Sequence, residues 1–486
     1  MSGSWTSTLL WLIPLAAAAL VLVLPVRDAT RGALALLATL ATAGLALAAA
    51  FRFDPSGGTQ YQQSHAWVRD IGLTYHVGMD GLSLVLVTLT AICVPCALGF
   101  GLWARRPNMR SYASLMLLLE AAVVLLLVAR DLALFYVGFE AMIVPLALLI
   151  AVWGGANRAR ASIRFVIYTL VGSLLMLIAI ITLGLRAGSF DLAHVGTSNS
   201  RWLFLAFMFA FAIKAPLYPF HGWVPDAYRE APPEVAGLLS GVVSKAGAYG
   251  MLRFALPLFP GPAHDLRRWI VAVAIVGLLW SSLVAFRQPD SRGVVAYSSI
   301  GQMSLIVVGI FVMNDIGATG ATFQMVNHGL LSVLLFLLAG VIEVRTGEGL
   351  FRRIGGLARG RAGLASIVMF GGIATLAVPG SALFASEFLV LLGAFRDWWL
   401  IGTLASGAIL LAAMYALRWI SALLHDPPAE PAPALSRMGD LRWETAYLLP
   451  LVACVLALSV YPYAVTHRVS LSMHGIVSAV TAKGGP

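Results

Sequence analysis

Residues 204–223 read FLAFMFAFAIKAPLYPFHGW, an apolar run that carries Lys214 near its middle and is broken by prolines directly afterwards. A second lysine, Lys245, lies within another apolar run, VAGLLSGVVSKAGAYGMLRF (235–254). The other cationic residues of the chain are almost all arginines in short polar breaks. A charge at membrane depth costs at least ~2.5–3.5 kcal/mol, so it is a functional-site hypothesis by default. Because a buried ammonium can lose its proton and a guanidinium effectively cannot, two buried lysines indicate proton handling.

The composition is typical of a multi-pass membrane protein. The chain is 60% hydrophobic and 11% charged, with a mean hydropathy of +0.88. We expect one membrane domain over 1–486, because no polar stretch is long enough for a soluble domain. A net charge of +10 could indicate nucleic-acid binding, but arginines flanking membrane spans explain it better. Cys93 and Cys96 have redox-motif spacing, yet their apolar setting favours packing over a redox or metal role.

The apolar runs predict an all-α protein with about fourteen membrane spans, since one span needs about 20 apolar residues. The first run follows MSGSW, which has no basic residue, so we expect a retained span and not a cleaved signal. Breaks on one side hold eighteen Lys and Arg and breaks on the other hold ten, which predicts both termini on the outer side. The predicted spans are 5–25, 31–51, 79–103, 110–129, 131–153, 161–186, 201–221, 235–259, 268–287, 292–312, 316–343, 362–395, 397–424 and 443–466.

Two glutamates lie at matched depth in a predicted helical hairpin. Glu120 and Glu140 are each ten residues from Arg130, on opposite arms. At 1.5 Å per residue each lies ~15 Å deep, near the middle of the bilayer core. Two such carboxylates can exchange a proton directly or through water. The alternative is a protonated glutamate that makes a structural hydrogen bond between helices.

Each buried lysine has a distinctive neighbourhood. Lys214 is thirteen residues past Arg201, too deep for easy snorkelling, and Pro216 begins the helix break that follows it. A lysine beside a broken helix is a common ion-path arrangement. Lys245 is surrounded by glycine and serine, which allow close helix approach. The alternative for Lys214 is a structural cation paired with a carboxylate.

His328 and Glu387 are the other ionisable groups that we expect to act in proton transfer. His328 suits a proton relay because the ordinary pKa of a histidine side chain is close to neutral pH. The alternative is that it is only a hydrogen-bonded core residue, as a lone histidine often is. Glu387 follows a second proline break, Pro379-Gly380, five spans after the first break. Paired broken spans in corresponding positions indicate two repeats and point to the ion path. Polar residues that could hold water precede His328 by one span: Tyr297, Ser298, Ser299 and Gln302.

Eight stretches carry a family resemblance. They are YHVGMDGLSL (75–84), DLALFYVGFEAMIVPLALLIAVWGG (131–155), RFVIYTLVGSLLML (164–177), FAIKAPLYPFHGWVPDAY (211–228), SKAGAYGMLRF (244–254), VVAYSSIGQMS (294–304), NHGLLSVLLF (327–336) and VPGSALFASEF (378–388). Together they resemble the antiporter-like, proton-translocating membrane subunits of respiratory complex I, the NADH-quinone oxidoreductase. The resemblance implies fourteen helices with inverted five-helix repeats over 110–259 and 268–424.

The resemblance also implies roles for single residues. Glu140 matches the family glutamate that pairs with a lysine, here Lys214, and Glu120 matches the glutamate one span earlier. Lys245 matches the next relay lysine, and His328 matches the group that connects the two halves.

The group at the exit of the path separates the sister subunits. Glu387 matches the exit group, where the M type carries glutamate and the L and N types usually carry lysine. The M type is the counterpart of mitochondrial subunit 4. Ser332 stands where the sister subunits often have a lysine, and Pro233-Glu234 replaces part of a commoner Thr-Ala-Gly-Ser stretch, so the inner entrance is expected to differ.

The expected function is proton translocation coupled to NADH-to-quinone electron transfer. No metal or cofactor site is expected in this chain, since NADH, flavin, iron–sulfur clusters and quinone would belong to partner subunits. The expected partners are the adjacent membrane subunits and the lipid of a bacterial plasma membrane. The alternatives are a subunit of a multisubunit cation/proton antiporter, of a membrane-bound hydrogenase or of an inorganic-carbon-uptake complex. A structural membrane spacer that has kept these ionisable groups is a further alternative.

Overall fold

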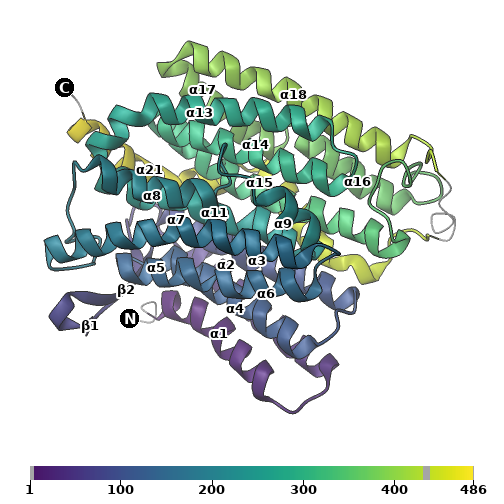
Figure 1. Ribbon diagram of the computed structural model, residues 1–486, viewed down its shortest axis with the longest axis horizontal. Helices are drawn as coiled ribbons and strands as arrows, with labels where there is room; N and C mark the ends of the chain where they lie inside the picture. The colour runs from purple at the N-terminus through teal and green to yellow at the C-terminus, as the bar shows by residue number, and fades with distance from the viewer. Residues whose placement is uncertain (1–4, 431–437, 485–486) are drawn as a thin grey trace.

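The computed structural model describes residues 5–430 and 438–484, and it is a bundle of long helices lying roughly side by side (Figure 1). Long runs of apolar residues form these helices because an apolar segment in lipid must satisfy its backbone internally. The helical elements are α1 (Thr6–Val23), α2 (Asp28–Arg52), η1 (Arg69–Ile71), α3 (Gly81–Trp103), α4 (Met109–Val128), α5 (Leu132–Ala141), α6 (Ile143–Trp153), α7 (Arg158–Ala187), α8 (Arg201–Lys214), α9 (Val224–Glu230), α10 (Pro233–Leu238), η2 (Leu239–Val243), α11 (Lys245–Gly250), η3 (Met251–Ala255), α12 (Leu256–Leu258), α13 (Pro260–Phe286), α14 (Ser291–Phe311), α15 (Asp315–Thr346), α16 (Ala362–Thr375), α17 (Ala382–Asp397), α18 (Trp399–Leu424), η4 (Trp443–Leu448), α20 (Leu449–Val460) and α21 (Tyr463–Gly484).

The predicted all-α fold is confirmed, with one small addition. Strands β1 (Gln60–Val68) and β2 (Leu73–Met79) form an antiparallel hairpin in the break where the sequence indicates a small ordered cap. The hairpin lies at the left end of the bundle in Figure 1, and we call that end the hairpin face and the other end the opposite face. The first turn of α1 and the end of α21 also lie toward the hairpin face (Figure 1).

Eleven helical segments among the described residues are long and apolar enough to cross a membrane. The bent pair formed by α20 and α21, whose axes differ by 73°, brings the number to twelve if it is counted as one span. The two other predicted spans, 201–221 and 362–395, correspond to interrupted segments that contain the shorter helices α8, α16 and α17. The chain is therefore a multi-pass membrane protein, and the count of fourteen spans remains a prediction.

Both helix breaks that the prolines predict are present. The first separates α8 from α9, and the second separates α16 from α17. A further break, which the sequence analysis missed, lies between α5 and α6 at Met142. Pro145 explains this break, because a proline nitrogen cannot donate to the carbonyl four residues earlier.

The helix that carries Lys245 has an unusual backbone. It begins as α10 and contains two π-helical segments, η2 and η3, that flank α11. Every residue of its membrane-spanning window is buried. Wide helical turns of this kind are rare and often mark functional positions.

Candidate functional site

Lys214 is the last residue of α8 and lies at the first helix break. Its side chain is 1% exposed, and its Nζ has no hydrogen-bond partner among the described residues. The ammonium nitrogen lies 4.8 Å from the centroid of the Phe139 ring. The indole of Trp223 donates to the carbonyl of Ile213 over 3.0 Å, so a side chain satisfies one carbonyl that the break frees.

Glu140 lies near Lys214 at the end of α5, just before the Met142 break. The two side chains are close enough to interact electrostatically, but no ion pair within 4.0 Å joins them in the described part of the chain. The expectation of a direct ion pair between Glu140 and Lys214 is therefore wrong for this structure. The ammonium instead lies over the Phe139 ring, whose face attracts a cation, and Glu140 Oε1 is buried without a partner.

Glu120 is fully buried in α4. Neither of its carboxylate oxygens has a hydrogen-bond partner among the described residues. Helix α4 packs against α5, as the predicted hairpin requires, but no hydrogen bond joins Glu120 to Glu140. A carboxylate buried in this way is costly unless water or a proton accompanies it. No described residue makes the hydrogen bond to Glu120 that a purely structural role between helices would require.

Lys245 contacts His328 directly. Lys245 Nζ lies 2.7 Å from His328 Nδ1 and donates to the carbonyl of Ser240 over 2.6 Å. The two residues are 83 positions apart in the sequence, and both side chains are buried. The contact joins the helix of Lys245 to α15, across the boundary between the two predicted repeats.

Glycines make this contact possible. A Cβ built on Gly241 would lie 2.6 Å from the carbonyl oxygen of Gly329, and one built on Gly329 would lie 2.7 Å from that of Gly241. Neither position has room for a side chain, so the two backbones pack directly against each other. The small residues around Lys245 are therefore needed to bring α15 within hydrogen-bonding range.

A cluster of serines lies beside Lys245. Ser240 Oγ donates to Ser299 Oγ over 2.7 Å and lies 2.5 Å from Ser332 Oγ. The backbone carbonyl of Ser240 also accepts a hydrogen bond from the Lys245 ammonium, so the serine cluster is connected to the lysine. Ser332 thus takes part in a hydrogen-bonded network at the position where the sister subunits often have a lysine.

Glu387 ends a second polar chain, on α17. It accepts a hydrogen bond from Gln302 Nε2 over 3.0 Å, and Gln302 Oε1 accepts one from Gln324 Nε2 over 2.5 Å. Ser386 Oγ donates to Gln324 Oε1, and Asn327 Nδ2 donates to Ser386 Oγ over 3.0 Å. Asn327 directly precedes His328, so this polar chain extends from Glu387 to the residue next to the relay histidine.

The second helix break supports the position of Glu387. Ser381 caps α17 by accepting from the backbone N–H of Phe384 over 3.2 Å. The backbone of Ala382 is satisfied by two side chains: its N–H donates to Ser459 Oγ over 2.9 Å, and its carbonyl accepts from Asn327 Nδ2 over 2.7 Å. Pro379-Gly380 therefore interrupts the helix where neighbouring polar groups can replace the lost backbone bonds.

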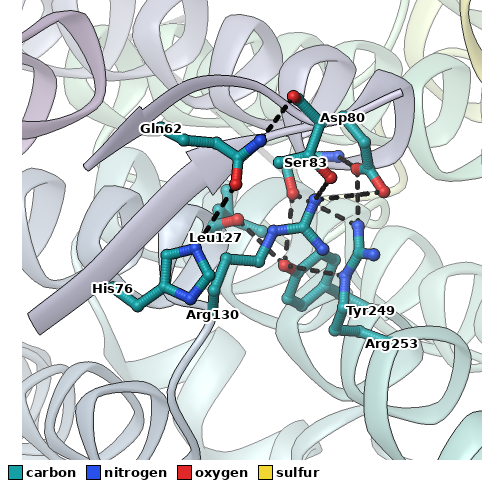
Figure 2. Close-up of polar contacts among 9 residues, drawn as sticks. Gln62, His76, Asp80, Ser83, Leu127, Arg130, Tyr249 and Arg253 are labelled. Carbon is teal, nitrogen blue, oxygen red and sulfur yellow. Dashed lines mark hydrogen bonds and ion pairs between the residues drawn. The ribbon is translucent and has the colours of Figure 1, made fainter. Parts of the chain in front are cut away.

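A charged cluster lies where the helix of Lys245 approaches the hairpin face (Figure 2). Arg253 Nη2 donates to Asp80 Oδ1 over 2.5 Å, and Arg130 Nη2 lies 3.5 Å from Asp80 Oδ2. Tyr249 OH accepts from Arg253 Nε over 3.3 Å and lies 3.2 Å from Ser83 Oγ. Burial by itself raises the pKa of Asp80, but the Arg253 and Arg130 guanidinium groups overcome that effect and hold the pKa well below its usual range.

The opposite end of the same helix also carries a buried ion pair. Glu234 is fully buried and accepts from Arg106 Nε over 2.8 Å, from Arg106 Nη2 over 2.9 Å and from Tyr112 OH over 2.8 Å. Glu234 is the residue at which the sequence departs from the commoner family pattern. The departure places a fully hydrogen-bonded carboxylate at the predicted inner entrance.

Of the six residues singled out in sequence, the structure joins two directly, Lys245 and His328, and places Glu140 near Lys214. No hydrogen bond or ion pair joins Glu120 or Glu387 to any of the other five residues. Sequence reasoning missed Gln324 and Asn327, although amides within an apolar helix are a usable signal. Within residues 5–430 and 438–484, no group of three or more His, Cys, Asp or Glu side chains is placed to hold a metal ion.

Fold and site together define a multi-pass membrane protein with ionisable side chains buried across both halves of its bundle. The sequence profile of the NADH:quinone oxidoreductase/Mrp antiporter transmembrane family matches residues 129–412, which is more than half of the chain. The chain belongs to that family.

Similar proteins cover nearly the whole chain. NADH-quinone oxidoreductase subunit M of Mycobacterium tuberculosis (strain CDC 1551 / Oshkosh) is 36% identical over 98% of this chain and 94% of its own length. The protein of that name from Rhodobacter capsulatus is 36% identical over 96% of this chain and 95% of its own length.

Solved structures share the fold. A chain of respiratory complex I from Thermus thermophilus superimposes with a TM-score of 0.87 at 30% identity, covering 97% of this chain and 99% of that one. A chain of the Mrp complex from Dietzia sp. DQ12-45-1b superimposes with a TM-score of 0.86 at 21% identity over the full length of both chains. The second likeness concerns the fold alone.

Proposed function

We propose that this chain is a proton-translocating membrane subunit of a bacterial NADH-quinone oxidoreductase. The observation that carries the proposal is the 2.7 Å contact between Lys245 Nζ and His328 Nδ1, which joins two titratable groups on helices of different predicted repeats. Relatives at 36% identity over nearly the full chain bear the name subunit M of that enzyme. The antiporter alternative has weaker support, because the Mrp chain is only 21% identical.

The proposed path begins at Glu140 and Lys214. Glu140 takes a proton and exchanges it with Lys214 through water, since no direct contact within 4.0 Å joins the two side chains among the described residues. Glu120, also buried without a partner, is the neighbouring carboxylate that can supply a proton through water. Both carboxylates and Lys214 have unpaired polar atoms, and such atoms are the groups that a file of water molecules would satisfy.

The path continues from Lys214 to Lys245. A Cβ on Gly247 would lie 2.7 Å from the backbone nitrogen of Ala215, so the helix of Lys245 passes directly beside the end of α8. Lys245 then exchanges its proton with His328 over the 2.7 Å contact. The serine cluster and the Ser240 carbonyl hold the Lys245 ammonium in place while it is charged.

Glu387 is the proposed exit. The hydrogen-bonded chain of Gln302, Gln324, Ser386 and Asn327 leads from this carboxylate to the residue that precedes His328. Amides and a hydroxyl can orient water for proton transfer without titrating themselves. Glu387 lies ten residues before Asp397, the end of α17 toward the hairpin face, so release occurs on that side.

The remaining features of the proposal concern the assembly. The chain acts as the non-redox, proton-pumping part of a translocase, and NADH, flavin, iron–sulfur clusters and quinone are bound by partner subunits. It contacts adjacent antiporter-like membrane subunits in a bacterial plasma membrane, with the hairpin face and both termini outside. Residues 110–259 and 268–424 form its two inverted repeats.

Proton uptake by membrane vesicles that carry the assembled complex tests the proposal. Lys245→Met keeps an apolar stem but removes the titrating group, so it should abolish NADH-driven proton uptake, while NADH oxidation with an artificial electron acceptor continues. Arg201→Gln is the control, because Arg201 forms an exposed ion pair with Asp265 that contributes little. Normal uptake in Lys245→Met at equal complex content would refute the proposal. Proton movement that depends on added sodium instead of NADH would favour the antiporter alternative.

A further inference from the structure

The helix of Lys245 ends in buried charge on both sides, but the two ends differ in sign. At the opposite face, Arg106 and Glu234 form a neutral pair, which Tyr112 completes. Nearby, Arg292 Nη1 lies 3.5 Å from Glu343 Oε2, a second neutral pair. The helix therefore meets the opposite face through groups whose fixed charges cancel.

Within the cluster at the hairpin face the charges do not cancel. Arg130 and Arg253 share the single carboxylate of Asp80, and all three side chains are at least 90% buried. The two other acidic side chains of this region have partners of their own: Asp191 Oδ2 lies 2.9 Å from His76 Nδ1, and Asp131 accepts from Thr74 and from the first turn of α5. No ion pair joins either of these carboxylates to Arg130 or Arg253, so the cluster of Asp80, Arg130 and Arg253, counted by itself, has a formal charge of +1.

The cluster lies on the same ridge of the helix as Lys245. Lys245, Tyr249 and Arg253 follow one another at intervals of four residues, and residues at this spacing are neighbours on a helix surface. Eight residues correspond to ~12 Å of helix. Tyr249 closes the interval by bonding to Arg253, to Ser83 and to the carbonyl of Leu127 over 2.9 Å (Figure 2).

We propose that the cluster of Asp80, Arg130 and Arg253 is an electrostatic barrier that keeps protons on Lys245 from escaping to the hairpin face. The inference rests on the proposed function, because it concerns the direction in which the Lys245 proton leaves. Fixed positive charges in a narrow pathway exclude cations and protons, as they do in water channels. With the hairpin side closed by charge, the open route for the Lys245 proton is His328.

The size of the barrier follows from Coulomb's law. A unit charge ~12 Å away, at an effective dielectric constant of about 20, changes the proton occupancy of a site by about tenfold. Tyr249 on this ridge is hydrogen-bonded to Arg253, to Ser83 of α3 and to the Leu127 carbonyl of α4. The residues of the barrier are therefore positioning residues, which act on the Lys245 proton and do not carry it.

Two variants that break the same ion pair separate charge from structure. Arg253→Gln leaves Asp80 paired with Arg130 and makes the cluster neutral. Asp80→Asn leaves two arginines and makes the cluster more positive. The measurement is passive proton conductance in vesicles with the assembled complex, after an imposed pH step and without NADH. We expect about a tenfold rise for Arg253→Gln and no rise for Asp80→Asn, whereas a purely structural seal would leak in both.

Further variants establish the route and the role of charge. Arg253→Lys keeps the positive charge and should restore low conductance. Lys245→Met combined with Arg253→Gln should abolish the leak, because the leak passes through Lys245. Arg106→Gln breaks the buried pair at the other end of the same helix and is the matched control, with no expected rise. Equal conductance in Arg253→Gln and wild type, or equal leaks in Arg253→Gln and Asp80→Asn, would overturn the barrier.

Because this measurement uses no NADH, it separates the barrier from the proposed function. A complex that leaks only in Arg253→Gln but never pumps with NADH would retain the barrier and refute the NADH-driven function. A complex that pumps normally with NADH and shows no Arg253-dependent leak would refute the barrier alone.

Discussion

Replacing Gly241 with alanine should uncouple Lys245 from His328 without touching either side chain. The new Cβ would lie 2.6 Å from the carbonyl oxygen of Gly329 and 2.5 Å from Val333 Cγ2. The valine methyl group can turn aside, but the backbone oxygen cannot. Ordinary carbon–oxygen contacts are about 3.3–3.6 Å, so the two helices must separate by ~0.7 Å.

This separation is large on the scale of the Lys245–His328 contact. A gap of 2.7 Å would widen to ~3.4 Å, beyond the usual limit of about 3.2 Å for a hydrogen bond of this kind. Overpacking of this size costs about 1–3 kcal/mol of stability, which a large buried bundle can tolerate. A misplacement of about 1 Å at a reacting group can lower a rate ~100-fold, so we expect proton pumping to fall about tenfold or more.

The assay compares NADH-driven proton uptake with NADH oxidation by an artificial acceptor in vesicles with equal complex content. Gly407→Ala in α18 is the matched control, because no atom beyond the neighbouring backbone of its own helix lies within 4 Å of the added Cβ. Alanine is also the better helix former by about 1 kcal/mol, so the control should assemble at least as well as wild type. Normal pumping in assembled Gly241→Ala would show that close packing of these helices does not set the relay distance.

Three further predictions concern the titrating residues, each measured as protons moved per electron pair in the assembled complex. Glu140→Gln should greatly reduce pumping and Glu140→Asp should keep part of it, because only the second variant retains a group that can release a proton; full activity in the glutamine variant would remove Glu140 from the path. Lys214→Arg should be far more damaging than a charge-conserving change, because a guanidinium effectively cannot release its proton; normal pumping would mean that Lys214 supplies only a fixed charge. Glu387→Gln should impair pumping while Glu387→Lys keeps some, since the related subunits use lysine there; an unchanged ratio and rate in the glutamine variant would leave Pro379-Gly380 as a packing feature only.

The sequence predicted the membrane fold and the two proline breaks because both depend on local composition. Long apolar runs must form helices in lipid, and proline must interrupt them, whatever the rest of the chain does. The break after Glu140 was missed, although Pro145 was visible, because this helix passes the length test for one uninterrupted span. The depth of a buried charge was likewise predictable from its distance to the nearest polar break.

Contacts between distant helices were not predictable in the same way. Sequence places Lys245 and His328 each at mid-depth, but only the packing of Gly241 against Gly329 brings them within 2.7 Å. The expected Glu140–Lys214 ion pair is absent because side-chain packing also decides this contact: the Phe139 ring lies against the Lys214 ammonium.

The charged cluster was missed because arginines near span ends are usually orientation signals. Arg130 and Arg253 both fit that pattern, and Asp80 fits the pattern of a helix cap, a role it also has for α3. Their joint burial depends on three segments that meet only in the folded chain: the start of α3, the turn before α5, and η3. The joint burial of these three charges was therefore visible only in the structure.

The bend between α20 and α21 has a mechanical consequence. Helix α21 turns by 73° and crosses the hairpin face, where it packs against α3, α13 and α15. Its Arg468 donates to the carbonyl of Ala50 over 3.3 Å, and its His474 lies 2.9 Å from Asp315 at the start of α15. Helix α21 also contacts α12, so it connects α2, α3 and the end of the first predicted repeat to α13 and α15 of the second. A rigid-body movement of the second predicted repeat against α2 and α3 would have to break these contacts, so the contacts of α21 oppose such a movement.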